Sequence, residues 1–186
     1  MSVDQALATD GLGLGAQAPL SESPKWHAHL RIDKYADDDA YARGETYEVT
    51  ECDGNIVVTA GWTRITTLLN AGTGNLISSS TARVGAGNGS TAVVIGDTDL
   101  SAAAGSANRW FQNATVSVPS APVLQFVAVF GTADGNFSWN EWCIDIGASN
   151  TSGNTVNATL LNRKVASNGT KASGQTWTAT ATITFS

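Results

Sequence analysis

The sequence predicts an all-β fold, an antiparallel β-sandwich or barrel that is compatible with a jelly-roll topology. Short segments with strand-like apolar patterns recur along the chain, and glycine, asparagine, aspartate or proline separates them. Their number, about seven to nine, is typical of such folds, and at most one segment has a helical pattern. The clearest strand is the last: between residues 176 and 186, odd positions are apolar and even positions carry threonine or serine.

The composition changes near residue 25, which divides the chain into an N-terminal arm and a single β-rich domain. Residues 1–24 contain many small residues, a glycine–leucine run and two prolines, which is too little apolar surface to order alone. We expect either a flexible arm or an arm that orders on a neighbouring subunit. In the second case its leucines would be the anchors (Leu7, Leu12, Leu14 and Leu20). Residues 25–186 form the β-rich domain.

The first third of this domain predicts three strands and an exposed loop. In residues 25–33 the apolar residues alternate with polar ones, so Trp26, Ala28, Leu30 and Ile32 share one face. Three consecutive aspartates mark an exposed acidic loop at residues 37–39. A short polar strand is expected at residues 45–51 and a stronger one at residues 55–60.

Residues 61–75 are the one plausible helix. Trp62, Ile65, Leu68 and Leu69 recur with helical spacing and form one apolar stripe. The Gly-Thr-Gly-Asn sequence that follows is a C-terminal stop signal. Threonines at positions 63, 66 and 67 leave a strand as the alternative.

The chain is organised around residues 123–147, which predict two buried strands joined by a turn at residues 132–136. The apolar face changes between Trp139 and Trp142, which indicates a bulge at positions 140–141 or a change of packing partner. Residues 81–100 are expected to be a glycine-rich loop between short apolar pieces. Two further strands are expected at residues 113–118 and 159–165.

Composition and charge exclude several functions. Only 14% of the residues are charged, against about 25% in an average globular protein, so the surface is neutral and polar and suits a stable assembly. The net charge is −6 and no basic cluster occurs, which argues against nucleic-acid binding. No apolar stretch is long enough to span a membrane, and the first 15 residues lack the pattern of a signal peptide.

Residues that could support chemistry are few. His27, His29 and Asp33 share one face of the first strand and could offer metal ligands, although the rest of the set would have to come from elsewhere. Cys143 would need one of these histidines as its base. With Cys52 it could also form a disulfide, but free buried thiols are the favoured reading. We therefore expect no catalytic, cofactor-binding or metal-ligating residues.

Three other patterns have structural explanations. The glycines at 85, 87 and 89 lack the lysine and the helix of a phosphate-binding loop, so a tight turn is expected. The pairs Asp97/Asp99 and Asp134/Asn136 have the spacing of calcium ligands without a full set, so turn capping is expected.

Glu141 and Asp145 would lie about 13 Å apart on one strand face, too far for a glycosidase pair. We expect Glu141 to be a structural carboxylate that bonds an arginine such as Arg109 or Arg163. Six tryptophans also allow a carbohydrate-binding module, the main competing class of function. Three of them lie on faces that are already apolar, which favours core packing (Trp26, Trp62 and Trp177).

An ordered set of segments in residues 61–186 resembles a family of tailed-phage virion proteins. The segments are, in order, GWTRITTLLNAGTGN, RVGAGNGSTA, DTDL, FGTADGNFSWNEWCID, TLLNRKV and GTKASGQTWTATATITFS. The resemblance implies a structural protein of the virion with no catalytic residues to carry over. Within that class a capsid decoration (cement) protein is the first choice, and a tail or fibre-associated protein is the alternative.

The resemblance also implies partners and a location. The protein would bind the major capsid protein between capsomers, on the capsid surface of the virion, after assembly in the host cytoplasm. It would also contact copies of itself, with a trimer as one arrangement, through its arm or a sheet edge. No nucleic acid, membrane or cofactor is expected among its partners.

Overall fold

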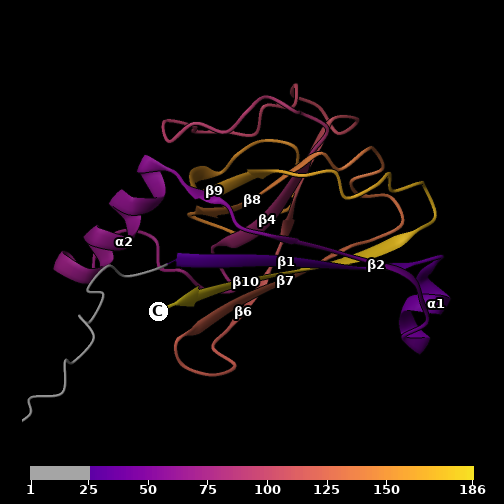
Figure 1. Cartoon of the computed structure of the whole chain (residues 1–186), viewed down its shortest axis with the longest axis horizontal. Coiled ribbons are helices and arrows are strands. Elements are labelled where there is room, and N and C mark those ends of the chain that lie inside the picture. The colour runs from indigo at the N-terminus through magenta and orange to yellow at the C-terminus, as the bar shows by residue number, and fades with distance from the viewer. Residues whose placement is uncertain (1–25) are drawn as a thin grey trace, which may run out of the picture.

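The computed structural model describes residues 26–186, apart from the side chains of Ala158 and Thr159. The predicted arm, residues 1–24, lies outside the described residues. The all-β prediction is confirmed: two antiparallel sheets pack face to face as a sandwich, and two short helices lie at its ends (Figure 1).

The first sheet has the strand order β2-β1-β10-β7-β6. Its strands are β1 (Trp26–Tyr35), β2 (Thr46–Asp53), β6 (Thr115–Ser117), β7 (Val123–Phe130) and β10 (Thr176–Phe185). The threonine-rich strand β10 lies at the centre and pairs with β1 and β7 along nearly its whole length. Its predicted alternation is confirmed, because the apolar residues at its odd positions are buried (Trp177, Ala179, Ala181 and Ile183). The last of the series, Phe185, is 39% exposed at the end of the strand.

The second sheet has the order β3-β9-β8-β4-β5. Its strands are β3 (Ile56–Val57), β4 (Ala82–Gly87), β5 (Arg109–Asn113), β8 (Glu141–Gly147) and β9 (Ala158–Val165). Strand β8 is buried along its whole length because β4 and β9 flank it and loops cover its outer face. This sheet therefore carries buried side chains on both faces.

Aromatic rings fill one end of the space between the sheets. The ring of Trp139 packs edge-on against Phe130 at 4.5 Å and against Trp177 at 5.1 Å. The indole nitrogen of Trp139 donates to the carbonyl of Gly135 at 2.9 Å, so the buried N–H is satisfied. These rings close the core where the chain crosses from the first sheet to the second.

Residues 123–147 do not form the predicted hairpin. Strands β7 and β8 belong to opposite sheets, and residues 131–140 cross between them. The change of apolar face has this cause: Trp139 packs in the crossover and Trp142 in β8, so the packing partner changes. The bulge of β8 is not at positions 140–141 but between Ile144 and Asp145.

The glycine-rich segment is also not a loop at its start, because residues 82–87 form the buried strand β4. A methyl group at Gly85 would lie 2.6 Å from the Cys143 sulfur and 2.7 Å from the Phe111 ring. Glycine is required there for close packing across the sheet, and not for a turn.

The expected strand at 113–118 is divided between the two sheets. β5 ends at Asn113, β6 begins at Thr115, and the buried Ala114 between them donates its N–H to Ala82. The expected strand at 55–60 is shortened to Ile56–Val57, because residues 59 and 60 already belong to a helix.

The predicted helix is confirmed as α2 (Thr59–Ala71), which ends at Gly72 in the left-handed conformation. Its apolar stripe is only partly covered: Ile65 and Leu68 are half-buried, whereas Trp62 and Leu69 are exposed. A second helix replaces the predicted acidic loop. This is α1 (Asp38–Arg43), whose first turn is capped by the Asp37 carboxylate.

Lys171 is buried beside the crossover, where its ammonium donates to the Gly131 carbonyl at 2.7 Å and to Asn136 Oδ1 at 2.8 Å. Burial lowers its pKa to about 8, although the carboxylates of Asp134 and Asp38 oppose this effect. Between pH 8 and pH 10.5, its ordinary value, the unfolded chain therefore holds this proton more often than the folded chain does.

We expect the free energy of unfolding of the wild type, relative to a Lys171→Met variant, to rise as the pH increases from 8 to about 10.5. Below pH 8 the lysine is charged in both states and adds no slope. Urea unfolding of both proteins at pH 7.5, 9 and 10 measures this difference, and other titrating groups cancel in the subtraction. A difference that stays flat or falls across this range contradicts the assigned protonation.

Candidate interaction surface

The outer face of the second sheet carries a network of buried ion pairs centred on Arg163. Its guanidinium donates to the Glu141 carboxylate at 2.7 Å and to the Asp97 carboxylate at 2.7 Å. It also donates to the carbonyl of Thr91 at 2.9 Å. Burial opposes the charge of Arg163, but its bonds to Asp97 and Glu141 outweigh this and raise its pKa.

Glu141 is fully buried and makes further bonds that tie a long loop to β8. Its carboxylate accepts the backbone N–H groups of Ser101 at 3.0 Å and Ala102 at 2.7 Å. The expectation of a structural carboxylate is confirmed, with Arg163 as its partner. Arg109 instead pairs with Asp99 at 2.7 Å.

Asp145 has an equivalent role at the other end of β8. It pairs with Arg83, whose guanidinium also donates to the carbonyls of Thr151 and Thr155 at 2.9 Å each. Asp145 further accepts the N–H of Asn157 at 2.9 Å. The two acids that suggested a glycosidase pair each hold a loop over the sheet.

Hydrogen bonds from two elements hold the tip of the loop over Arg163, residues 93–97. The Asp97 carboxylate accepts the N–H of Val94 at 3.0 Å, while Arg163 holds the same carboxylate from below. On the other side, Thr59 donates its N–H and its hydroxyl to the carbonyl of Ile95, at 2.8 and 3.1 Å. The ion-pair network and the start of α2 thus position the tip of this loop.

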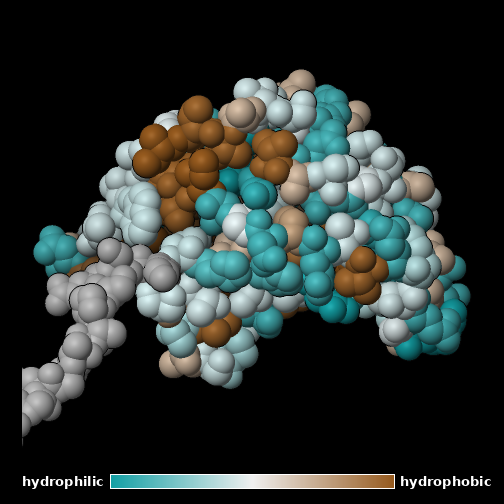
Figure 2. Space-filling model, viewed as in Figure 1, coloured by the Kyte–Doolittle hydropathy of each residue, from teal (hydrophilic) through white to brown (hydrophobic). Residues whose placement is uncertain are grey.

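The fixed tip displays apolar side chains, and we call the resulting patch the apolar surface (Ile56, Val93, Val94, Ile95 and Val165). Val94 is 58% exposed, Ile95 61% and Ile56 41%. Figure 2 shows a large hydrophobic area beside the first turns of α2 and β9. Within it lies a hollow of about 410 Å³, lined by Ile56, Val93 and Val165 together with Gly54, Asn55, Arg163 and Lys164.

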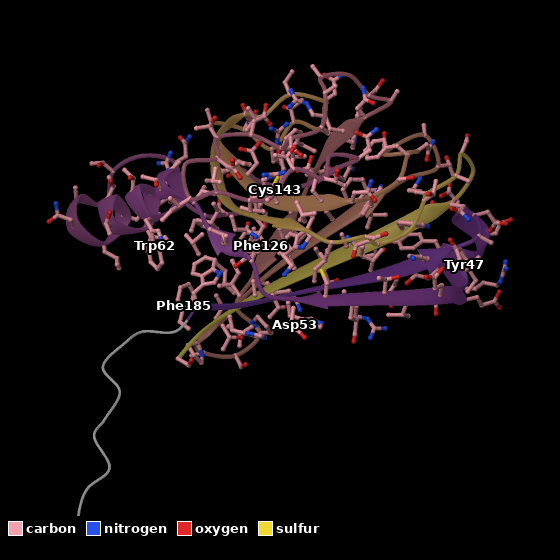
Figure 3. The ribbon with its side chains drawn as sticks, turned by 45° about the horizontal axis from the view of Figure 1, so that its top comes forward. Tyr47, Asp53, Trp62, Phe126, Cys143 and Phe185 are labelled. Carbon is pink, nitrogen blue, oxygen red and sulfur yellow. The ribbon has the colours of Figure 1, made fainter. Side chains whose placement is uncertain are left out.

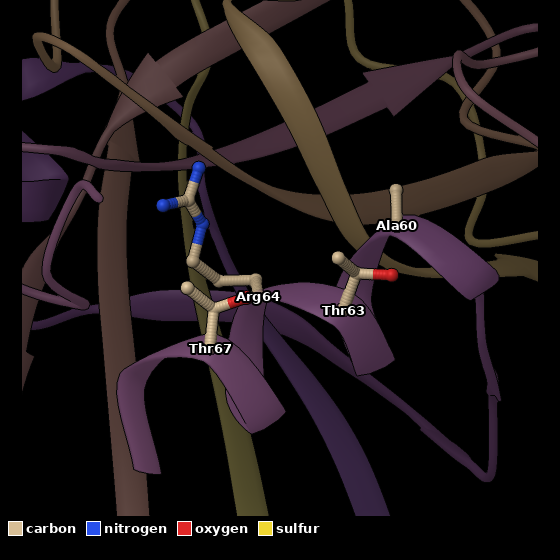
Figure 4. Close-up of a pocket in the computed structure, with 4 residues that line it drawn as sticks. All are labelled: Ala60, Thr63, Arg64 and Thr67. Atoms are coloured by element: carbon tan, nitrogen blue, oxygen red, sulfur yellow. The ribbon is translucent and has the colours of Figure 1, made fainter. Parts of the chain in front are cut away.

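A second hollow of about 280 Å³ lies on α2 itself (Figure 4). Ala60, Thr63, Arg64 and Thr67 line it, so its functional groups are two threonine hydroxyls and one guanidinium, and the rest of the lining is aliphatic. No acid, histidine or cysteine joins them. The apolar surface is therefore the better candidate for a functional contact.

The two histidines lie on the outer face of the first sheet, and the structure does not join them to Asp33. His29 Nδ1 lies 2.8 Å from Asp53 Oδ1 and His27 Nε2 lies 3.5 Å from it, whereas Asp33 pairs with Arg31. The hydrogen bond with His29 lowers the pKa of Asp53. In the described part of the chain, no group of three or more His, Cys, Asp or Glu is placed to hold a metal ion.

Both cysteines are free, as expected. Cys143 packs in a small apolar cluster with Phe111 and Leu160 on the outer face of β8, where burial raises the pKa of its thiol well above the usual range. Cys52 is only half-buried, and burial raises its pKa as well. Both sulfurs are therefore neutral thiols at neutral pH.

The two suspected calcium loops have other partners. Asp97 and Asp99 each bind an arginine, Arg163 and Arg109. The Asn136 side chain accepts from Lys171 and donates to the Thr132 carbonyl at 3.0 Å, which closes the turn.

The tryptophans differ in their exposure. Trp177 is buried, as predicted, but Trp62 is 43% exposed and does not belong to the core. Its ring lies edge-on to Trp26 at 6.2 Å, and Trp26 in turn contacts Phe185 at 5.2 Å (Figure 3). The sequence does not reveal this exposure because α2 packs on the sheet through Gly61 and Ile65, which leaves Trp62 at the edge of the contact.

Comparison with protein-family models, with curated proteins and with solved structures finds no match to this chain. Among the described residues, neither helix has the length and apolar character needed to cross a membrane.

Proposed function

We propose that this chain is a non-enzymatic structural protein of a tailed-phage virion, and within that class a capsid decoration protein. The observation that carries the proposal is the apolar surface, which buried ion pairs hold in place. Exposed apolar patches mark sites of protein–protein contact. A loop that is ordered before binding also loses less conformational entropy when the contact forms, which favours a stable assembly.

Two further observations support this class. The ordered motifs of residues 61–186 resemble a virion protein family, and Glu141 and Arg163 of those motifs form the ion pair under the apolar surface. The low content of charged residues, 14%, suits a surface that stays in contact with a shell. The partner would be the major capsid protein, together with neighbouring copies of this chain.

The proposal predicts that an aspartate at the fixed tip weakens binding to capsids. Purified protein is mixed with preformed shells, and the bound fraction is measured after sedimentation. We expect Val94→Asp and Ile95→Asp to reduce the affinity about tenfold or more, because a buried unpaired carboxylate is costly at an apolar contact. Both side chains are exposed, so the thermal unfolding midpoint should stay close to that of the wild type.

Val118→Asp is the matched control, because Val118 is 65% exposed and lies outside the apolar surface. It should bind shells as the wild type does. Equal binding by all variants would contradict the assigned surface. If the wild type binds purified tails and not shells, the tail-associated alternative replaces the decoration protein.

A carbohydrate-binding module is the second candidate, and the exposed ring of Trp62 is the observation that favours it. Aromatic rings at a protein surface can pack against the apolar faces of sugars. A glycan array separates the two functions, since a decoration protein should give no sugar signal. A specific glycan signal that disappears in Trp62→Ala, without shell binding, would establish the second candidate.

A further inference from the structure

The sandwich has four edge strands, and three of them offer little room for another strand. β3 and β6 are two and three residues long. β5 is already bridged on its free side, where Phe111 and Gly153 exchange backbone hydrogen bonds at 2.7 and 3.0 Å. β2 differs, because it is eight residues long and no residue in the described ranges hydrogen-bonds to its outer edge.

The register of β2 with β1 identifies the groups that point outward. The N–H of Gly54 donates to the carbonyl of Ala28 at 2.7 Å, so these two residues form a hydrogen-bonded pair at the end of the ladder. Hydrogen-bonded and non-hydrogen-bonded pairs alternate along antiparallel strands. Cys52 and Thr50 therefore direct their backbone groups toward β1.

The residues between them direct their backbone groups the other way. These are Val49, Glu51 and Asp53, whose N–H and C=O groups face solvent at the outer edge. Tyr47 and Asp53 lie near opposite ends of the strand, so the open edge extends along most of its length (Figure 3). Such a row of unpaired groups is the template on which an extended peptide adds to a sheet.

The acidic side chains of β2 favour a basic partner strand at its open edge. The strand contains Glu48, Glu51 and Asp53 and no basic residue. Their side chains are 53%, 50% and 70% exposed, so each is accessible from the edge although each already contacts a cation or a histidine of β1. A second copy of β2 would bring three more acids to the same place, and like charges across a strand pair are destabilising.

We propose that the outer edge of β2 binds an extended, basic segment of a partner protein, which adds to the first sheet as a further strand. The backbone of the segment bonds to Val49, Glu51 and Asp53, and its lysines or arginines face the carboxylates of Glu51 and Asp53, which share the outer face of β2. If the segment belongs to the shell protein, that assignment rests on the proposed function. The open edge and its charge are independent of the proposed function.

A synthetic peptide in which lysine alternates with valine tests the proposal, with the glutamate counterpart as its control. We expect the lysine peptide to slow amide hydrogen exchange at Val49, Glu51 and Asp53 by about tenfold or more. The amides of Thr50 and Cys52 already bond to β1, so their exchange should change little. The glutamate peptide should protect none of these amides.

Val49→Pro and Val49→Ala form the matched pair of variants. Both remove the valine side chain, but only proline removes the outward N–H, and proline is tolerated on the solvent side of an edge strand. We expect Val49→Pro to weaken binding of the lysine peptide about tenfold, and Val49→Ala to leave it nearly unchanged. If Val49→Pro unfolds, the same peptide with N-methyl groups on alternate residues repeats the test on the wild type.

Three results would overturn the inference: equal binding of both peptides, binding without protection of the outward amides, or concentration-dependent protection in the absence of peptide, which indicates a second copy on the edge. Shell binding keeps the two proposals separate. If shells bind but the lysine peptide does not, the inference fails and the proposed function stands. If the lysine peptide binds and shells do not, the proposed function fails alone.

Discussion

Arg163→Met is expected to lower the free energy of unfolding by about 3–5 kcal/mol. The substitution leaves the Glu141 carboxylate fully buried with no cation, and it also removes the support of Asp97 and of the Thr91 carbonyl. Methionine has a similar length and can fill much of the space, so the loss reports the missing charge more than a cavity. Urea unfolding at pH 7 measures the change.

Arg43→Met is the control for this experiment. Arg43 also pairs with a carboxylate, that of Glu45 at 2.9 Å, but both side chains are more than half exposed. An exposed pair contributes at most about 1 kcal/mol, so this variant should unfold close to the wild type. Equal effects of the two substitutions would show that the network under the apolar surface does not stabilise the fold.

Gly61→Ala is expected to destabilise the protein by about 1–3 kcal/mol, although alanine is normally the better helix former by about 1 kcal/mol. Gly61 lies in the first turns of α2, where the helix meets β9. A methyl group there would overlap the carbonyl oxygen of Leu161 and lie 2.8 Å from its carbonyl carbon. Because these are backbone atoms, only a displacement of the helix can relieve the overlap.

The matched control is Gly96→Ala, since a methyl group at Gly96 would meet no atom within 4 Å. Thermal unfolding of both variants gives the comparison, and Gly96→Ala should have a midpoint at or slightly above that of the wild type. A more stable Gly61→Ala would mean that α2 does not rest on β9 as described. Displacing α2 should also loosen the bonds from Thr59 to Ile95, so we expect the same variant to bind shells more weakly.

The local sequence pattern predicts the structure correctly where each face of a strand or helix has a single environment, either core or solvent. The alternation of β10, the apolar face of β1 and the presence of a helix follow from periodicity, although α2 spans Thr59–Ala71 and not the expected 61–75. The buried bond of Glu141 to an arginine follows from the cost of an unpaired buried charge. Glu141 lies between Trp139 and Trp142 in the sequence, and a carboxylate in so apolar a segment indicates a buried ion pair.

The pairing of distant segments could not be derived from such patterns. Residues 123–147 have the composition of a hairpin, but whether β8 pairs with β7 or with β4 depends on which glycines permit close approach. Gly85 and Gly87 of β4 provide that space beside Cys143 and Glu141. The same glycines looked like a loop because composition does not distinguish a crowded strand from a turn.

The exposed patch was equally hidden in the sequence. Val93, Val94 and Ile95 are apolar in sequence, and the bonds of Asp97, Thr59 and Arg163 hold the loop that carries them at the surface. Free edges are likewise a property of the assembled sheet, so the open side of β2 had no local signal beyond its three acids.

The position of β10 between β1 and β7 has a consequence for how the molecule folds. Trp26 at one end of the first sheet pairs with Phe185, so the centre of that sheet cannot form until segments from opposite ends of the domain meet. Closing so long a loop costs entropy before any contact repays it, and folds with such distant pairings form in milliseconds to seconds. During that time β1 and β7 both lack their partner strand, and transiently unpaired edges of this kind make a folding chain prone to aggregate.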